Sequence, residues 1–365
     1  MKELTKFKQL RVLFAFSLSL GLSLAFCSNS SGQDITPIPR ITINDGAGAA
    51  AAISYGGDPQ FNAVVALILA NNGQGSNYCT GVLISPNTVL SARHCDIRTN
   101  EFVRFGPDAD NPIFSAGISS VSLPGGGSPF SQLLNGGDVA IITLSRNIPS
   151  SIATPLRLTD RTLDLVGEEA SVIGYGAAGL GSTGGFGNNV LRWGAQNVLD
   201  RYGTAASGGG SGNNIISMDF DNGSNANNSL GSRIPLPLEG TVAVGDSGGP
   251  VLVQQDGEWL VAGVLSGGTT AGGVYGDVSW WTGIQPFQAQ IEAAGGVFFT
   301  EADPPLLGDV NLDGVRGFLD ISPFIDVLSS GGFQIEADLD QNGVVNFLDI
   351  SPFISALMGM PPSNS

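Results

Sequence analysis

The chain has 365 residues and a formal net charge of −17. Its length predicts about two domains, and its excess of acidic residues argues against nucleic acid and anionic membrane surfaces as partners. Hydrophobic residues make up 42% of the chain, enough for a sizeable core, and 53 glycines and 20 prolines favour short strands between many turns.

The N-terminus has the pattern of an export signal, which we assign to residues 1–30. A cluster of lysine and arginine residues precedes an apolar run, Val12 to Phe26, that is short for a membrane span. The pattern predicts a secreted or cell-surface protein whose mature chain has no transmembrane segment. Cys27 after the run is a candidate for lipidation, although Phe26 before it is a poor match to the small residue expected there.

Residues 31–57 are rich in Pro, Gly and Ala and have little periodicity. We interpret them as a pro-segment or an N-terminal linker that wraps onto the next domain. From Phe61 to Thr282, short apolar runs alternate with clusters of Gly, Asn, Pro and Ser. Many short strands at this spacing indicate a sandwich or barrel, so we predict a mostly β domain at residues 58–297.

Two stretches inside this domain, 203–213 and 221–232, are rich in Gly, Ser and Asn and predict surface loops. Asp219 and Asp221 border the second stretch. They could bind a cation, but a polar loop favours the simpler interpretation of two solvated acids.

Ser247 carries the strongest chemical signal in the chain. It lies in Gly245-Asp246-Ser247-Gly248-Gly249-Pro250, where glycines permit a tight turn with two amide N–H groups pointing at one spot. Taken alone, this motif also fits an ordinary polar turn. The only histidine, His94, lies upstream and is followed by Cys95, a combination that is hard to attribute to chance.

A serine hydroxyl needs a base to act as a nucleophile, and the base needs an orienting carboxylate. His94 is the only imidazole available. Asp138 is the best candidate for the carboxylate, because it leads directly into the apolar run 139–144 and an acid there costs stability unless it is paired. The alternative is a turn aspartate that caps a strand.

With these residues in the order His, Asp, Ser, the chain resembles the chymotrypsin-like, or trypsin-fold, serine peptidases. Unrelated serine hydrolases use other orders. The resemblance extends from about Phe61 to Ile291 and implies a double six-stranded antiparallel β-barrel. The matching segments are Ala92-x-His94-Cys95, Asp138-Val139-Ala140-Ile141-Ile142 and Gly245-Asp246-Ser247-Gly248-Gly249-Pro250.

The resemblance implies a role for each residue of the candidate site. Ser247 would attack the scissile carbonyl, His94 would take and return its proton, and Asp138 would orient the imidazole. The backbone N–H groups of Gly245 and Ser247 would form the oxyanion hole. Ser266, Gly267 and Gly268 would line the substrate backbone, and Ser266 would also bond Asp138.

Cysteine content fits the same resemblance. Removing the signal leaves an even pair, which implies a disulfide in an exported protein. Cys79, in Cys79-Thr80-Gly81-Val82-Leu83-Ile84, matches a family strand whose cysteine pairs with the one beside the histidine, here Cys95. The family's other disulfides have no counterpart here, so the primary pocket lacks the disulfide that usually stabilises it.

The primary pocket is predicted to be neutral. Thr241, six residues before the serine, takes the position that often forms the pocket floor, and Ser279 aligns best with a wall position. Neither is an aspartate, so cleavage after Arg or Lys is not supported. An apolar or mid-sized residue is expected at the P1 position of the substrate.

Activation is the point where the chain departs most from the family. The family's cleavage frees an Ile or Val amino group that pairs with the acid before the serine, here Asp246. Arg40-Ile41 is the nearest candidate, but it lies 20 residues before Phe61 and lacks the usual Val-Gly-Gly. Arg40 as an ordinary linker residue is the alternative.

A linker at 298–306 leads to an internal repeat. Phe318 to Ile325 recurs identically as Phe347 to Ile354, 29 positions later. Each repeat has oxygen-bearing side chains at loop positions 1, 3, 5 and 12 and a glycine at position 6, which is the EF-hand spacing for calcium. The predicted ligands, with the position-7 carbonyls included, are Asp309, Asn311, Asp313, Val315 and Asp320, and Asp338, Asp340, Asn342, Val344 and Asp349.

Aspartate at position 12, followed by an apolar helix face, resembles a type I dockerin over residues 307–359, with a tail at 360–365. The resemblance implies a small all-α domain that folds around two calcium ions. A cohesin-like or cell-surface protein is the implied partner, and a stabilising cap is the alternative.

Together these observations predict a secreted serine endopeptidase, a hydrolase of protein or peptide substrates, with a calcium-dependent docking or anchoring module. One alternative is a protease-fold binding protein without catalytic activity. An esterase with the same triad is another, although the strand at Ser266 to Gly268 favours a peptide, because an extended substrate can add to it.

Overall fold

The computed structural model describes residues 41–69, 77–127, 132–185, 190–203, 213–270, 272–300, 306–312 and 315–358. The chain forms two compact units, one up to Phe299 and one from Thr300. The predicted signal peptide, Cys27 and Arg40 lie outside the described residues, as do Asp313 and the tail. Within the described residues, no helix combines the length and apolar character that a membrane crossing requires.

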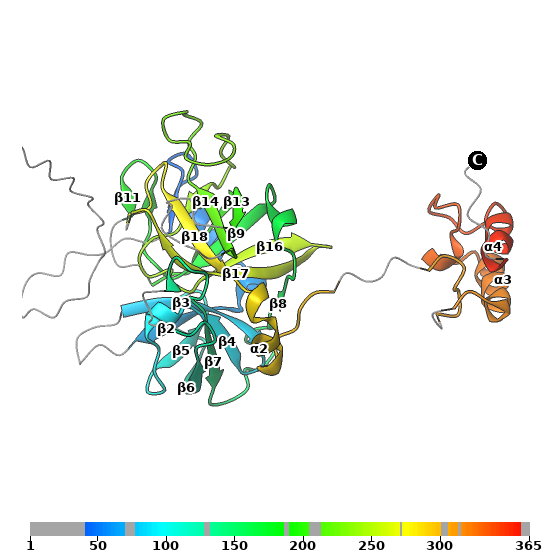
Figure 1. Cartoon of the computed structure of the whole chain (residues 1–365), viewed down its shortest axis with the longest axis horizontal. Helices are drawn as coiled ribbons and strands as arrows, with labels where there is room; N and C mark the ends of the chain where they lie inside the picture. The colour runs from blue at the N-terminus through cyan, green and yellow to red at the C-terminus, as the bar shows by residue number, and fades with distance from the viewer. Residues whose placement is uncertain are drawn as a thin grey trace, which may run out of the picture. The chain divides into compact units, whose positions relative to one another are not determined.

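The first half of the larger unit is a closed barrel of six antiparallel strands in the order β2-β3-β4-β7-β6-β5. It is the cyan barrel in Figure 1. Its strands are rich in Val, Leu and Ile, and the side chains that face inward are almost fully buried. The strands are β2 (Val64–Leu69), β3 (Asn77–Ser85), β4 (Thr88–Ser91), β5 (Phe102–Phe105), β6 (Phe114–Ser122) and β7 (Ala140–Leu144).

The second half differs from the predicted second six-stranded barrel, because its described residues form an open sheet of eight strands. The main path runs β12-β9-β16-β17-β18-β14-β13, and β8 pairs with β17. The short β13 ends at Gly203, and no ladder among the described residues joins it to β12. The strands are β8 (Arg157–Leu158), β9 (Glu169–Gly174), β12 (Trp193–Val198), β13 (Arg201–Gly203), β14 (Ile215–Asp219), β16 (Pro250–Gln255), β17 (Glu258–Gly268) and β18 (Val278–Gly283).

A small third sheet holds the start of the described chain against the second half. It has the order β11-β10-β1-β15, with β1 (Thr42–Ile43) parallel to β10 (Gly179–Leu180) and antiparallel to β15 (Gly240–Thr241). The fourth strand is β11 (Gly184–Gly185). The N-terminal segment is therefore built into the sheet that also carries the predicted pocket floor, Thr241.

Helix α1 (Ala49–Gly56) follows, in a segment where the sequence analysis expected no helix. Four consecutive alanines favour it. Its last residue fits tightly against β12, because a Cβ on Gly56 would lie 2.2 Å from the backbone of Trp193. A second helix, α2 (Gln288–Ala293), ends the β-rich unit.

The C-terminal unit contains helices α3 (Ile321–Ser330) and α4 (Ile350–Leu357), one from each repeat. Their equivalent phenylalanines, Phe324 and Phe353, stack with ring centroids 4.0 Å apart and an interplanar angle of 5°. Both rings are buried in a small core of their own. Identical sequence thus gives a pseudo-symmetric pair, and the predicted small helical unit is present.

Arg192 provides the first stability test. Its fully buried guanidinium donates hydrogen bonds to the carbonyl oxygens of Gly56 at the end of α1, Asp58 in the connection, and Val64 at the start of β2. Arg192→Leu would leave these buried carbonyl oxygens without their hydrogen-bond donor. We therefore expect the free energy of unfolding to fall by about 1–3 kcal/mol. Urea denaturation measures it, with Arg201→Leu at an exposed site as the control. An equal effect of both substitutions would contradict this account.

Candidate active site

His94 and Asp138 lie side by side because neighbouring strands deliver them. His94 is in the 3₁₀ turn Arg93–Cys95 after β4, and Asp138 lies two residues before β7. Strands β4 and β7 pair, with Ser91 opposite Ala140. The register of one barrel ladder therefore sets the spacing of these two side chains.

Asp138 holds the histidine through both carboxylate oxygens. Its Oδ2 lies 2.7 Å from His94 Nδ1, and its Oδ1 accepts a hydrogen bond of 2.9 Å from the His94 backbone N–H. The carboxylate is fully buried, so water does not compete for it. This double contact favours the tautomer with the proton on Nδ1, which leaves Nε2 free to accept a proton.

Ser247, in the second half of the domain, contacts the side of the His94 ring that faces away from Asp138. Its Oγ lies 2.8 Å from His94 Nε2. Gly245 and Gly248 on either side have φ of +96° and +77°, which favours glycine. A Cβ on Gly248 would also lie 2.1 Å from Ser91 Oγ, so the turn has no room for a side chain there.

The backbone of the serine turn leaves donors for an incoming oxyanion. Gly248 N–H donates to Leu265 O, and Asp246 N–H donates to Ala243 O. The N–H groups of Gly245 and Ser247, by contrast, have no hydrogen-bond acceptor among the described residues. These are the two groups that the sequence analysis assigned to the oxyanion hole.

The predicted disulfide between Cys79 and Cys95 is confirmed. It joins β3 to the turn that carries His94, across a separation of 16 residues. Beside it, Thr80 N–H donates to Ser247 O at 2.8 Å. Strand β3 therefore connects the histidine turn and the serine turn, which come from different halves of the domain.

One predicted contact is wrong. Ser266 was expected to bond Asp138, but its hydroxyl pairs with Thr282 Oγ1 at 2.9 Å. The β17–β18 ladder has a register shift between Leu265 and Gly267, at Ser266 itself. In this register the hydroxyl meets β18, while both oxygens of Asp138 are engaged by His94.

Two of the predicted pocket residues, Thr241 and Ser279, lie in contact. Thr241 Oγ1 lies 2.7 Å from Ser279 Oγ, and both side chains are buried, so the two hydroxyls satisfy each other. Gly267 and Gly268 continue β17 beyond its last residue paired with β16, Val264. Among the described residues, no strand pairs with the other edge of Gly267 and Gly268, so an extended substrate can add there.

Asn214 is a positioning residue that the sequence analysis missed. Its Nδ2 donates to Gly136 O and Gly283 O, both at 2.9 Å, and so ties the loop before Asp138 to the end of β18. A Cβ on Gly136 would lie 1.8 Å from Asn214 Oδ1. No sequence signal marks this asparagine, because its partners are backbone atoms far along the chain.

Comparison with known proteins identifies the domain. Residues 56–289, more than half of the chain, match the family model described as trypsin. The chain belongs to the trypsin family. A solved structure described as HL collagenase is 19% identical, with a TM-score of 0.50, over 66% of this chain and 95% of that chain. Neuropsin, a serine protease of mouse brain, is also 19% identical, with a TM-score of 0.49, over 65% and 96%.

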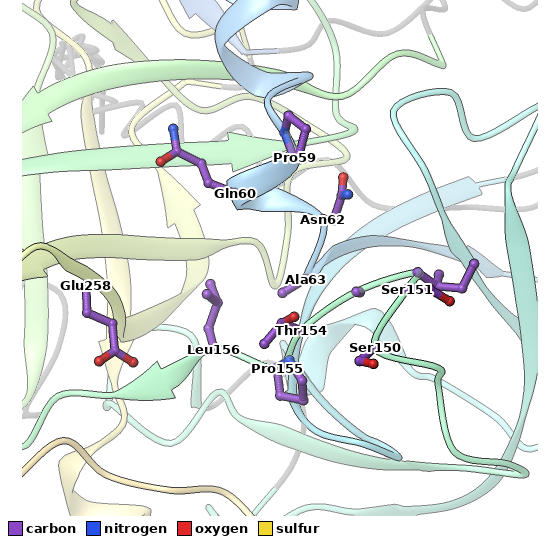
Figure 2. Close-up of a pocket in the computed structure, with 12 residues that line it drawn as sticks. Pro59, Gln60, Asn62, Ala63, Ser150, Ser151, Thr154, Pro155, Leu156 and Glu258 are labelled. Atoms are coloured by element: carbon purple, nitrogen blue, oxygen red, sulfur yellow. The ribbon is translucent and has the colours of Figure 1, made fainter.

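The trypsin-family domain also has a cavity away from these residues. It has a volume of about 400 Å³ and is lined by residues 59, 60, 62 and 63, by residues 150–156 and by Glu258. Figure 2 shows Gln60, Thr154 and Glu258 around it. None of its lining residues belongs to the triad or the predicted pocket, so we assign it no part in the chemistry.

The two C-terminal loops repeat the same backbone contacts. In the first, Asp320 accepts hydrogen bonds from the N–H groups of Asn311 and Gly317. In the second, Asp349 accepts from Asp340 and Asn346. Both aspartates are fully buried at the start of a helix. The position-12 acids therefore close both loops in the same way.

The second loop also gathers carboxylates around one point. Asp338, Asp340 and Asp349 offer ligand oxygens that all lie within 4.8 Å of one another. Carboxylate oxygens on a tight loop are the donor set that calcium prefers. Within the first loop, Asp313 lies outside the described residues.

Proposed function

We propose that the protein is a secreted serine endopeptidase. The observation that carries this proposal is the unbroken line of contacts from Asp138 through His94 to Ser247. Its two links are 2.7 and 2.8 Å long, and the two residues at its ends come from different halves of a trypsin-family domain. Membership in the family gives the serine-peptidase fold, while peptide cleavage by this chain is our inference.

In the proposed reaction, Ser247 Oγ attacks the scissile carbonyl as His94 Nε2 removes its proton. The resulting imidazolium is stabilised by the buried Asp138 carboxylate. The N–H groups of Gly245 and Ser247 bind the oxyanion, and His94 then gives its proton to the leaving amine. Water attacks the acyl-enzyme in the second half of the cycle by the same proton path.

The proposed substrate is an extended peptide that adds to the open edge of Gly267 and Gly268. Its P1 side chain would enter above Thr241 and Ser279. Because these hydroxyls bond each other and carry no charge, the pocket favours an apolar or mid-sized side chain.

Activation by cleavage after Arg40 is consistent with where the next residue lies. Ile41 is 1% exposed and directly precedes β1, in the sheet that carries Thr241. Asp246 would form the ion pair with the new amino group. Its carboxylate is fully buried and accepts hydrogen bonds from the backbone N–H groups of Gly176 and Ala243. We therefore propose Ile41 as the N-terminus of the active form.

We also propose that the C-terminal unit binds two calcium ions and docks onto a protein partner, either cohesin-like or at the cell surface. Two neighbouring apolar side chains of each loop, at positions 10 and 11, are exposed in both repeats. Their exposed fractions are 88% and 73% for Phe318 and Leu319, and 81% and 67% for Phe347 and Leu348. Apolar side chains this exposed favour a protein contact.

Peptide hydrolysis tests the proposed enzyme. The chain with Ile41 as its N-terminus is expected to cleave a peptide library, and Ser247→Ala to lower kcat/KM by about 10⁴-fold or more, as in other triad enzymes. Mass spectrometry of the products measures both. Unchanged cleavage by Ser247→Ala would contradict the assignment, and no cleavage by the parent chain would favour a binding protein.

Pocket chemistry is tested by Thr241→Asp. A buried carboxylate at the floor is stable only with a counter-charge, so the variant should gain about tenfold or more in kcat/KM for Arg or Lys at P1 relative to apolar P1. Thr241→Asn is the uncharged control and should leave that ratio unchanged. If Thr241→Asp also leaves it unchanged, Thr241 does not contact the P1 side chain.

Calcium in the C-terminal unit is tested by Asp349→Ala in the full chain. Because buried carboxylates repel one another without the ion, removing one ligand should abolish binding at the second loop and lower the helical circular dichroism. Calorimetric titration with calcium measures the loss. Asp326→Ala, an exposed acid on α3, is the control, and equal calcium binding in both variants would contradict the proposal.

A further inference from the structure

Four acids of the trypsin-family domain lie together without a basic partner. Asp219 ends β14, Asp221 follows it, Asp200 lies between β12 and β13, and Glu239 directly precedes β15. Asp219, Asp221 and Glu239 are 1%, 4% and 2% exposed. None of the four forms an ion pair with Arg or His among the described residues. The interpretation of Asp219 and Asp221 as solvated acids is therefore wrong.

Two carboxylate oxygens in this cluster are buried and accept no hydrogen bond from an N–H or hydroxyl group among the described residues. They are Asp219 Oδ1 and Asp221 Oδ1. The other oxygen, Asp219 Oδ2, accepts hydrogen bonds from the backbone N–H groups of Ser229 and Leu230. Those amides fix the carboxylate, so Oδ1 is held in place without a donor. A buried anionic oxygen in this state needs a cation or a proton.

The described residues around the four acids supply further oxygen atoms, and no arginine among them forms an ion pair with the cluster. Asn228, in the loop that wraps Asp219, has a buried Oδ1 without a partner. Asp200 Oδ2 accepts the Asp219 N–H, and its Oδ1 fills the space where a Cβ on Gly231 would lie, at 1.9 Å. Arg233 of the same loop donates outward to Gly223 O.

Burial is the main cause of the raised pKa values of three acids in this cluster. Burial, with the neighbouring acids adding to it, raises the pKa of Asp200 to about 7 and that of Asp221 to about 7. Burial likewise raises the pKa of Glu239 to about 8.

We propose that Asp219 and Asp221, with Asp200, Glu239 and Asn228 around them, bind one calcium-like divalent cation. The donor set contains only oxygen, which suits a hard cation. No three of the four carboxylates have oxygens within 4.8 Å of one another, unlike Asp338, Asp340 and Asp349. Binding would therefore draw them inward, and backbone carbonyls and water would complete the six to eight ligands that calcium takes.

The position of the site connects it to the substrate pocket. Glu239 lies two residues before Thr241, and its carbonyl oxygen accepts the Asn44 N–H just after β1. Asn197 Nδ2 bridges Asp219 O and Gly240 O at 2.7 and 2.8 Å. A cation here would stiffen the segment that carries both the pocket floor and the N-terminal strand.

The test uses the full chain with Ser247→Ala to prevent self-cleavage, and with Asp320→Asn and Asp349→Asn to silence the C-terminal loops. We expect calorimetry to detect one calcium ion per chain. Calcium at about a hundred times its dissociation constant should raise the unfolding midpoint of the β-rich domain by roughly 5–10 °C. No binding, together with no change in midpoint, would overturn the proposal.

Asp221→Asn tests whether the ion binds at this cluster. The fold should tolerate the substitution, because the Asp221 side chain has no hydrogen bond to lose among the described residues. Calcium affinity should fall by more than about tenfold. The midpoint without calcium should rise, because one charge leaves the repelling group. Asp256→Asn, at an exposed turn, is the charge-matched control. Equal calcium affinity in the two variants would overturn the proposal. The test needs no catalysis, so it stands apart from the fate of the proposed peptidase.

Discussion

The buried Asp138 carboxylate is the constraint on which the candidate active site depends. It cannot be left without partners inside the barrel, and His94 satisfies both of its oxygens through the ring and the backbone. The ring plane is fixed as a result, and Nε2 is aimed at Ser247. The β4–β7 ladder, the disulfide and the β3 contact to the serine turn all serve to hold this one geometry.

Much of the site could be predicted because its chemistry needs particular residue types in a particular order. A chain with one histidine leaves no choice of base, and glycines on both sides of Ser247 indicate the turn that the structure contains. The disulfide could be predicted from cysteine count and family resemblance together. The division into a β-rich and a helical unit could be read from the change in composition and the internal repeat.

The features that could not be predicted from the sequence depend on contacts with backbone atoms or on the register of paired strands. Ser266 meets Thr282 because of a shift in one ladder, which no residue pattern marks. Asn214 acts on carbonyl groups that any residue would supply. Asp219 and Asp221 stand beside a polar loop, and only the folded chain shows that the loop covers them and leaves two oxygens without partners. The open second sheet likewise depends on which strands pair.

The central claim is that Ser247 is activated by His94, and covalent labelling measures it most directly. The chain beginning at Ile41 would be treated with a fluorophosphonate, digested and mapped by mass spectrometry, beside His94→Ala. We predict one phosphonylated residue, Ser247, in the parent chain, and labelling slower by orders of magnitude in His94→Ala. Labelling at equal rates in both, or at another serine, would contradict the account.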